Sequence, residues 1–342
     1  MINIDGAKGE GGGQIIRTAL GLSLVTGKAV HLNNVRAKRS RPGLQKQHLV
    51  AVLAAAEVGQ AKVSGAELGS QEIRFFPGEV KAGDYTFDIG TAGSTTLVVQ
   101  TLLPALMVAA VPSRLEIIGG THNPMAPSAG FLAHAFAPTL AKFGPQLDVV
   151  AQPLGFYPAG GGKLTVTIEP RKQLERIEML ARGEIVLRRA IAYCAKLPAS
   201  IGERELERVS HGLQWHDRGA ELKTVVLHDT RSPGNALEIT IGSEHAVEVV
   251  VALGERGKPA ESVAEEAVVA ARSYLEAEVP IGEHLADQLL IPLALAGGGA
   301  FVTLPLTLHT TTNMRTIERF LPVKFEQREL EPGKWQVSVH AA

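Results

Sequence analysis

The pattern of apolar and polar residues at positions 301–310 predicts a β-strand that presents one histidine. The apolar residues at its even positions would share one face, and His309 would lie on the other face at the strand's end. Thr312 or Asn313 would then cap a helix that Pro322 ends. Because unpaired N–H groups at a helix N-terminus favour anions, His309 is placed to meet a phosphate. The alternative is a partly buried histidine at a strand end.

At the N-terminus the pattern predicts a short strand over residues 2–5, a glycine-rich loop over residues 9–14 and a helix that ends at Gly27. Such a loop can hold a phosphate through backbone N–H groups, although it has neither the dinucleotide fingerprint nor the Walker A sequence. The alternative is a tight turn. Glu10 lies within the loop, and a carboxylate repels a phosphate unless a cation lies between them. Glu10 therefore predicts Mg²⁺ or Mn²⁺.

The order of glycine-rich loop, apolar helix and strand recurs over residues 88–118 and 282–310, which indicates an internal structural repeat. Residues 182–278 differ, because short strands alternate there with two amphipathic helices. This pattern predicts a smaller α/β domain inserted between repeats. We therefore expect an α/β (α+β) protein with a large catalytic domain over residues 1–181 and 279–342.

The amino-acid composition and net charge exclude several classes of function. The chain has 342 residues, of which 45% are hydrophobic and 20% charged, as in ordinary globular proteins. A net charge of -1 and an aromatic content of 5% argue against whole-surface nucleic-acid binding and against base-stacking platforms. Cys194 is the one cysteine, which excludes an intramolecular disulfide and a Cys-rich zinc site, and its apolar neighbours predict a buried position. The N-terminus does not read as a signal peptide, and the longest apolar run, residues 97–111, is too short to cross a membrane. We expect a cytoplasmic protein without membrane contact.

Basic residues gather in one short segment of this nearly neutral chain. Residues 35–48 contain Arg36, Lys38, Arg39, Arg41 and Lys46. Guanidinium groups bind phosphates through paired N–H donors, so the segment is a candidate site for an anion or an RNA backbone. The alternative is a solvated basic loop.

Five motifs and His309 together resemble the RNA 3′-terminal phosphate cyclase family, in that family's order and over almost the whole chain. The motifs lie at residues 5–17, 36–44, 90–94, 155–162 and 284–288. The resemblance implies three repeated βαβαββ-type units, like the C-terminal domain of translation initiation factor 3, and an inserted thioredoxin-like domain. It also implies an enzyme that uses ATP to convert an RNA 3′-phosphate into a 2′,3′-cyclic phosphodiester.

The resemblance further implies a covalent route. His309 would attack the α-phosphorus of ATP and release pyrophosphate, and AMP would then pass to the RNA 3′-phosphate. The adjacent 2′-OH would finally close the ring and expel AMP. A neutral imidazole suits this relay, because it is nucleophilic near pH 7 and forms a labile phosphoramidate.

Carried over position by position, the resemblance assigns further roles. Glu10 would bind the metal, and the catalytic phosphate region would contain Arg17, Arg36 and Arg39 beside His309. Nucleotide contacts would come from Gln47, Gln100, His284, Leu285, Ala286, Asp287 and Gln288. The chain also departs from the pattern: His284 stands where bacterial members often have tyrosine, and His122 and Gly130 replace acidic residues.

Three other functions remain open. One is a non-catalytic cyclase-like protein of ribosome assembly, although the presence of His309, Glu10 and Asp287 argues against it. The second is an enolpyruvyl transferase, whose repeated units also have glycine-rich turns but which needs no nucleotide. The third is a plain RNA-binding module that binds RNA ends without consuming ATP.

Overall fold

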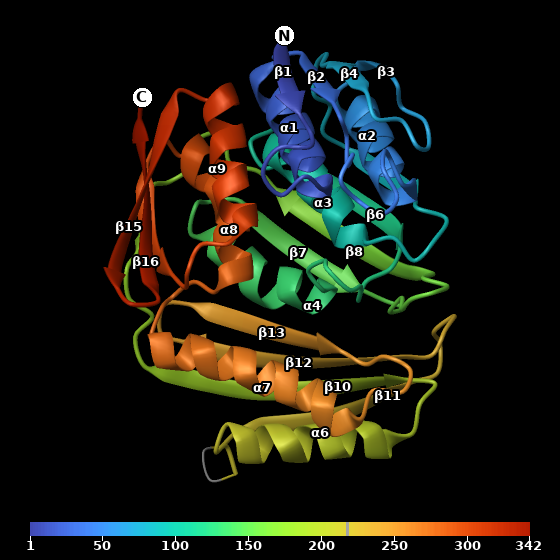
Figure 1. Ribbon diagram of the computed structural model, residues 1–342, viewed down its shortest axis with the longest axis vertical. Coiled ribbons are helices and arrows are strands. Elements are labelled where there is room, and N and C mark those ends of the chain that lie inside the picture. Colours follow the sequence, from blue (N-terminus) through green and yellow to red (C-terminus); the bar gives the residue numbers. More distant parts are fainter. Residues whose placement is uncertain (217–218) are drawn as a thin grey trace.

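Four sheets of four strands organise the part of the chain that the computed structural model describes, residues 1–216 and 219–342 (Figure 1). Asp217 and Arg218, which fall in the predicted inserted domain, lie outside the described residues. The result is a mixed α/β protein, as the sequence predicts. No described helix is both long and apolar enough to cross a membrane.

Three of the sheets have the same strand order and directions. The first contains β1 (Ile2–Asp5), β2 (Val30–Asn33), β4 (Ile73–Phe76) and β3 (Lys62–Ser64). The second contains β5 (Asp84–Asp88), β6 (Ser113–Gly119), β8 (Gly162–Glu169) and β7 (Gln146–Ala151). The third contains β9 (Ile177–Met179), β14 (Gly299–Thr303), β16 (Lys334–Ala341) and β15 (Val323–Glu331). In each sheet the first two strands are parallel and the later pairs are antiparallel.

The chain segment that forms each of these three sheets also contains helices, which lie at corresponding places between its strands. The first has α1 (Gly13–Thr26) and α2 (Lys46–Val58), and the third has α8 (Glu283–Leu295) and α9 (Leu308–Phe320). The second has α3 (Thr95–Leu106) and a continuous helical segment of α4 (Ala129–Phe131), the π-helical η1 (Leu132–Phe136) and α5 (Ala137–Ala141). The order of elements is therefore βαβαββ in the first two segments. The third has the same order, but residues 185–277 of the fourth sheet and its helices interrupt it between β9 and α8.

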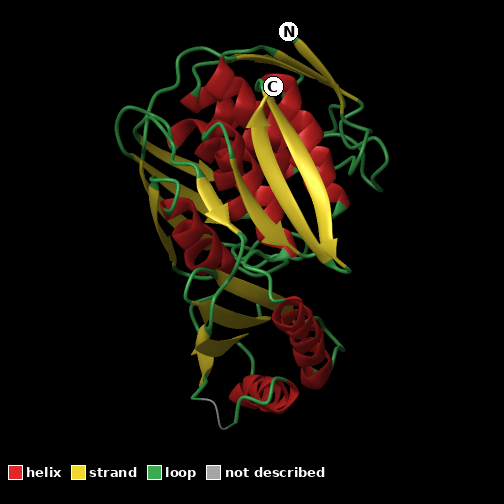
Figure 2. Cartoon of the chain, turned by 90° about the vertical axis from the view of Figure 1, so that its left-hand side faces the viewer, coloured by secondary structure: helices red, strands yellow, loops and turns green. Residues whose placement is uncertain are grey.

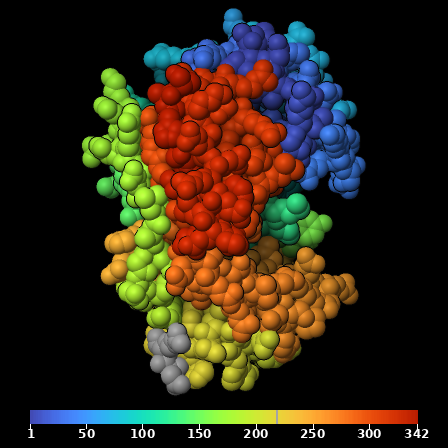
Figure 3. All heavy atoms as spheres, turned by 60° about the vertical axis from the view of Figure 1, so that its left-hand side comes forward, coloured from blue at the N-terminus to red at the C-terminus, as the bar shows by residue number. Residues whose placement is uncertain are grey.

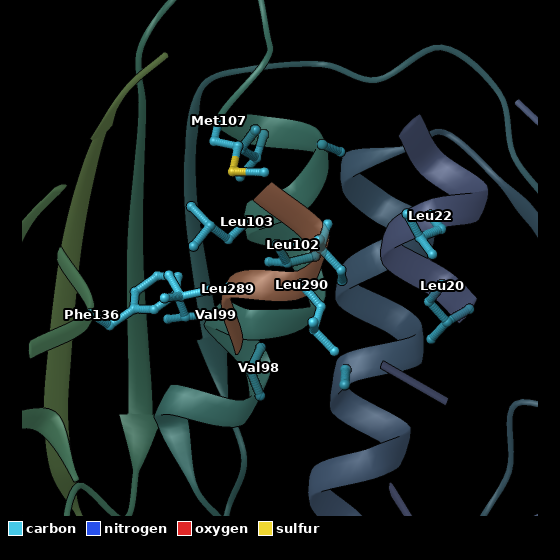
Figure 4. Close-up of a cluster of buried hydrophobic side chains, with 14 of the residues drawn as sticks. Leu20, Leu22, Val98, Val99, Leu102, Leu103, Met107, Phe136, Leu289 and Leu290 are labelled. Carbon is cyan, nitrogen blue, oxygen red and sulfur yellow. The ribbon is translucent and has the colours of Figure 1, made fainter. Parts of the chain in front are cut away.

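The helices of these three segments pack against one another to form the main core. One buried apolar cluster, part of which Figure 4 draws, contains leucine and valine side chains of α3 together with Leu20 and Leu22 of α1 and Leu289 and Leu290 of α8. The apolar faces of the helices, spaced at helical periodicity, are buried in this way. Figure 2 shows the hairpin of β15 and β16 lying in front of the helices, and in Figure 3 the C-terminal segment covers one face of the molecule.

The fourth sheet has its own core. It contains β11 (Glu221–Leu227), β10 (Ile185–Ala195), β12 (Gly234–Ser243) and β13 (Val247–Leu253), in that order. Helices α6 (Ala199–Gly212) and α7 (Ala260–Ala277) pack against it and enclose Trp215 and Tyr274 in a separate apolar cluster. Cys194 is buried on β10, as predicted.

The predicted strand over residues 301–310 is wrong in its second half. Strand β14 ends at Thr303, and helix α9 begins at Leu308, so His309 lies in the first helical turn. The cap is Thr307, whose Oγ1 accepts a hydrogen bond from the N–H of Thr310, and not Thr312 or Asn313. A hydroxyl at this position satisfies an N–H group of the first turn, which outweighs the alternating pattern.

Most other predicted elements are confirmed, with differences at their ends. Helix α1 ends as expected at Gly27, which has φ 68° and donates its N–H to Ser23. Within the predicted repeat over residues 88–118, the helix is α3, which ends at Leu106. The pairing of β15 with β16 was not predicted: β15 is mostly charged and exposed, although β16 alternates Trp335, Val337 and Val339 with polar residues.

Candidate functional site

The glycine-rich loop folds Glu10 back against the start of α1. The N–H of Glu10 donates to Thr312 Oγ1 at 3.0 Å, and the N–H of Gly12 donates to Glu10 Oε2 at 2.7 Å. Gly9 and Gly11 have φ of 61° and 65°, which other residues rarely adopt. Helix α1 has Gly12 as its N-cap and no side-chain cap, so its first N–H groups point outward without a side-chain partner. This is the geometry that binds anions.

Arg39 of the basic segment lies against this loop. Its Nη2 pairs with Glu10 Oε1 and also donates to the Glu10 carbonyl at 3.3 Å. The Glu10 side chain is 7% exposed, whereas that of Arg39 is 36% exposed. The carboxylate is therefore enclosed by protein groups while the guanidinium can still meet a bound molecule.

His309 lies on the other side of Glu10, with its Nε2 3.9 Å from Glu10 Oε1. Its Nδ1 is 3.0 Å from Gln14 Oε1, and Gln14 Nε2 donates to Asp287 Oδ2 at 2.7 Å. With this amide orientation Gln14 Oε1 can only accept, so Nδ1 carries the proton and Nε2 carries the lone pair. The nitrogen of His309 that carries the lone pair thus faces Glu10 of the glycine-rich loop, and the side chain is half-exposed.

Helices α1, α8 and α9 are joined by polar bonds at this point. Thr18 Oγ1 donates to Asn313 Oδ1 at 2.7 Å, and Asn313 Nδ2 donates to the Asp287 carbonyl at 2.8 Å. Thr18 and Asn313, which are 295 positions apart in the chain, therefore meet through a short buried hydrogen bond. These bonds fix the side chains of Gln14 and Asp287 relative to His309.

Burial and positive charge set the protonation states of the site. Burial, with Arg17, Arg39 and His284 nearby, lowers the pKa of His309 below its usual 6.5. Burial lowers the pKa of Arg17 to about 10, with Asp287 opposing the shift. Burial raises the pKa of Asp287 to about 7, although Arg17 acts in the opposite direction. His309 is therefore neutral near pH 7.

A small cavity of about 60 Å³ opens between α1, α3 and α8. Gln100, Asp287 and Gln288 line it together with Gln14 and Arg17. The other residues of α8 that were predicted to contact the nucleotide differ in their exposure to solvent. His284 is exposed, whereas Leu285 and Ala286 are buried in the core, so only their backbone could meet a ligand.

Arg36 and Gln47 make contacts within the scaffold around the site. Arg36 has φ 53°, and its Nη1 donates to the carbonyls of Arg41 and Gly43 at 2.7 and 2.8 Å. Gln47 Oε1 accepts a hydrogen bond from the N–H of Ser94 at 3.0 Å, which joins the start of α2 to the loop before α3. The structure thus brings together Glu10, Arg39, His309 and Asp287, and places Arg36 in the basic segment and Gln47 at the start of α2.

The sequence did not reveal four residues of this site: Gln14, His48, Thr312 and Asn313. Gln14 belongs to the glycine-rich motif, so its position was a signal that could have identified it. His48 is buried beneath Gly13, and burial, reinforced by Arg36 and Arg17, lowers its pKa to about 3. Thr312 and Asn313 were predicted as caps, and their long-range bonds have no signature in a single sequence.

The described residues contain no group of three or more His, Cys, Asp or Glu side chains placed to hold a metal ion. Glu10 is a single carboxylate, and Oε1 already pairs with Arg39. Mg²⁺ commonly binds through one carboxylate, with phosphates and water completing its shell, so Glu10 fits such an ion only as one ligand of several.

Comparisons with known proteins agree with this arrangement. Residues 8–327 match the family model described as RNA 3′-terminal phosphate cyclase. A protein of that name from Koribacter versatilis is 51% identical over 331 residues, 97% of this chain and 93% of that protein. A protein of the same name from Pseudomonas fluorescens is 48% identical, over 100% of this chain and 98% of that protein. Another, from Salmonella typhimurium, is 46% identical, over 97% of this chain and 97% of that protein. The chain therefore belongs to the RNA 3′-terminal phosphate cyclase family of enzymes.

Proposed function

We propose that the protein converts RNA 3′-terminal phosphates to 2′,3′-cyclic phosphodiesters in an ATP-dependent reaction. Family membership supports the reaction class. The observation that carries the proposal is a neutral, half-exposed His309 whose Nδ1 is held by Gln14 and whose Nε2 faces Glu10 and Arg39. A cytoplasmic location stays a prediction.

In the proposed first step, His309 Nε2 attacks the α-phosphorus of ATP, forms a bond to AMP and releases pyrophosphate. The Nδ1 proton stays on the ring, shared with Gln14, as positive charge develops on the imidazole. AMP then passes from His309 to the RNA 3′-phosphate, which gains a good leaving group. The neighbouring 2′-OH attacks the activated phosphorus, loses its proton and expels AMP.

Phosphate binding is assigned to Arg39, Arg17 and the start of α1. Arg39 is partly exposed beside the glycine-rich loop, and the N–H groups of α1 lack a side-chain cap. Phosphoryl transfer depends mainly on positioning and on charge stabilisation, which these donors supply. Arg36 would act indirectly, because its Nη1 already binds two backbone carbonyls of its own loop.

Nucleotide binding is assigned to the cavity of Gln100, Asp287 and Gln288 and to the start of α8. His284 is exposed there and could cover a base, while Leu285 and Ala286 would contribute backbone atoms. Gln47 would keep the loop before α3 in place through Ser94. Mg²⁺ or Mn²⁺, held in part by Glu10, would neutralise phosphate charge when bound.

We further propose that residues 1–181 and 279–342 form one catalytic domain of three repeated units, and that residues 182–278 are an inserted thioredoxin-like domain. The shared strand order of three sheets and the separate core of the fourth support this division. Glu10, Gln14, Asp287 and His309 all come from the first and third segments.

The test is incubation with [α-³²P]ATP and Mg²⁺ in the absence of RNA. We expect a labelled, acid-labile protein adduct that His309→Ala abolishes. A wild-type protein without label, or full labelling of His309→Ala, would contradict the mechanism. A non-catalytic relative, an enolpyruvyl transferase and a plain RNA-binding module would all remain unlabelled.

The second test follows the RNA product. A ribo-terminated oligonucleotide 3′-phosphate should be cyclised, whereas a 2′-deoxy terminus should stop at the adenylylated stage, because the ring needs the 2′-OH. Arg39→Ala, measured separately for self-adenylylation and for AMP transfer, would show which step uses this arginine.

A further inference from the structure

A second and larger cavity, of about 550 Å³, is lined by residues of β7, η1, β10, β11 and β12. It shares no lining residue with the cavity of Gln100 and Asp287. Its size is in the range of small-molecule sites. The proposed cyclase chemistry makes no use of it.

The polar base of this cavity is Glu238 on β12, which is 3% exposed. Ser128 Oγ donates to Glu238 Oε1 at 2.5 Å. Among the residues that the structure describes, none donates a hydrogen bond to Oε2. Oε2 is not among the buried polar atoms that lack a partner, so it is open to the cavity and can accept a donor from a bound molecule.

His122 lies beside Glu238 and is also 3% exposed. Its Nδ1 contacts Thr121 Oγ1 at 2.9 Å, whereas its Nε2 is buried without a hydrogen-bond partner, although Glu238 Oε1 is only 3.3 Å away. His122 and Glu238 therefore face each other as a close pair, while Glu238 Oε2 keeps its acceptor capacity toward the cavity. This is the condition in which a ligand supplies the missing contact.

The carboxylate is ionised in this setting. Burial by itself would raise the pKa of Glu238, but His122, Ser128 and His134 outweigh burial and hold the pKa below its usual value. Burial and Glu238 raise the pKa of Tyr193, which also lines the cavity, to about 12, so the phenol is neutral. Arg189 shares this face of the sheet, but its Nη2 points to Thr240 at 3.5 Å and it does not line the cavity.

The Glu238 carboxylate fits in this position because residue 130 is a glycine without a side chain. A Cβ on Gly130 would collide with both carboxylate oxygens of Glu238. The lining includes the aliphatic side chains of Ala133, Val149 and Ala151 and also the imidazoles of His134 and His228. At the rim lies a second carboxylate, the exposed Asp229.

We propose that this cavity binds an aliphatic diamine. One ammonium group would pair with Glu238 Oε2, the methylene chain would lie along the aliphatic walls, and the second ammonium group would reach Asp229. An ammonium ion supplies the donors that the buried carboxylate lacks, and the Tyr193 ring offers a favourable face to a cation. The competing arrangement is a closed His122–Glu238 ion pair that needs no ligand.

The test is calorimetric titration of the full-length protein with 1,4-diaminobutane, at fixed ionic strength and without RNA or nucleotide. We expect saturable binding at one site, weaker binding of butylamine and none of 1,4-butanediol. Glu238→Gln should weaken diamine binding by about 10- to 100-fold, the value of a hydrogen bond to a charged group. Asp229→Asn should weaken it less, because that carboxylate is exposed.

Asp148→Asn is the matched control, since Asp148 is an exposed carboxylate on β7 that does not line the cavity. It should bind the diamine like the wild type. Absence of saturable binding, full affinity in Glu238→Gln, or an equal loss in Asp148→Asn would overturn the proposal. If Glu238→Gln does not fold, Gly130→Ala tests the same point, because its Cβ displaces the carboxylate. Failure of this proposal would leave the adenylylation result unchanged.

Discussion

The Nδ1 atom of His309 lies 3.0 Å from Gln14 Oε1, and Gln14 in turn donates a hydrogen bond to Asp287. One amide thus links the proposed nucleophile to a buried carboxyl group on another helix. It fixes the proton on Nδ1 and keeps Nε2 free to attack. Gln14 is a positioning residue, and its removal should affect the first chemical step.

Gln14→Ala should slow self-adenylylation roughly 100-fold, because a misplaced imidazole loses its attack geometry. Gln14→Glu is the sharper variant. A carboxylate beside Nδ1 favours the imidazolium, so the pKa of His309 should rise and the reaction should recover only at higher pH. The rate of label incorporation from [α-³²P]ATP between pH 5.5 and about 8.5 measures both effects. A pH profile identical to that of the wild type would contradict the role of Gln14.

The lowered pKa of His309 predicts a simple pH dependence in the wild type. The neutral, nucleophilic form predominates above the folded-state pKa, which burial and Arg17 hold below 6.5. Self-adenylylation should therefore be flat from about pH 7 upward and should fall only on acidification. NMR titration of the imidazole protons without nucleotide measures this pKa directly. Arg39→Met removes a nearby positive charge and should raise the pKa, and an unchanged pKa would show that the Arg39 charge does not act on His309.

His48 predicts a loss of stability in acid. Its folded-state pKa, about 3, lies below the unfolded value near 6.5, so the unfolded chain takes up a proton that the folded protein does not. This stability is present above pH 6.5 and is lost as the pH falls toward the folded value, by on the order of 3 kcal/mol at about pH 4.5.

His48→Asn should flatten this dependence, because its amide can still accept the bond that Gln45 N–H donates to Nδ1. Urea unfolding at two pH values gives the difference for each protein. His340→Asn is the control, since His340 is exposed on β16. Equal acid sensitivity of His48→Asn and the wild type would contradict the prediction.

Asp287 should act with the opposite sign. Burial raises its pKa to about 7, so the folded protein holds a proton that the unfolded chain has lost. This contribution is present below the unfolded value near 3.9 and disappears as the pH rises through about 7. Asp287→Asn should remove the dependence between those values while keeping an acceptor for Gln14, which urea unfolding can test. A slope unchanged from that of the wild type would mean that Asp287 titrates normally.

Glu10→Ala should slow adenylylation by about 100-fold or more while the fold stays intact, because it removes both the Arg39 pair and a proposed metal ligand. Glu10→Gln keeps an acceptor for the N–H of Gly12 and separates charge from loop geometry. Rates measured across a Mg²⁺ titration, with circular dichroism for folding, test this. Full activity of Glu10→Ala would remove Glu10 from the site.

Gly13→Ala tests how closely the loop packs. A Cβ at this position would lie 2.6 Å from His48 Nε2 and 2.9 Å from Arg17 Nη1, so the arginine must move. We expect weaker ATP use with little loss of helix content, since alanine favours helices. Gly27→Ala would be a poor control, because an alanine at φ 68° strains the backbone. The control is therefore Ala56→Gly on α2, which lies outside the site. Unimpaired ATP use in Gly13→Ala would show that the loop can accommodate a Cβ at this position without displacing Arg17.

The sequence by itself determined the local elements and the kinds of chemistry available. Helical periodicity and Gly27 defined α1, and the glycine-rich loop with Glu10 was visible as a candidate phosphate site. These signals are local, because they depend on residues a few positions apart. The element that carries His309 was misjudged for the same reason: alternating residues predicted a strand, while the Thr307 cap started a helix.

Only the tertiary structure decided which side chains meet. Gln14, Asp287 and His309 come together because α1, α8 and α9 bury their apolar faces against one another. The lowered pKa of His309 is a property of that packing, since desolvation and the two arginines act only once the helices are assembled. The chain encodes the groups, and burial of the helices brings them within bonding distance and sets their charges.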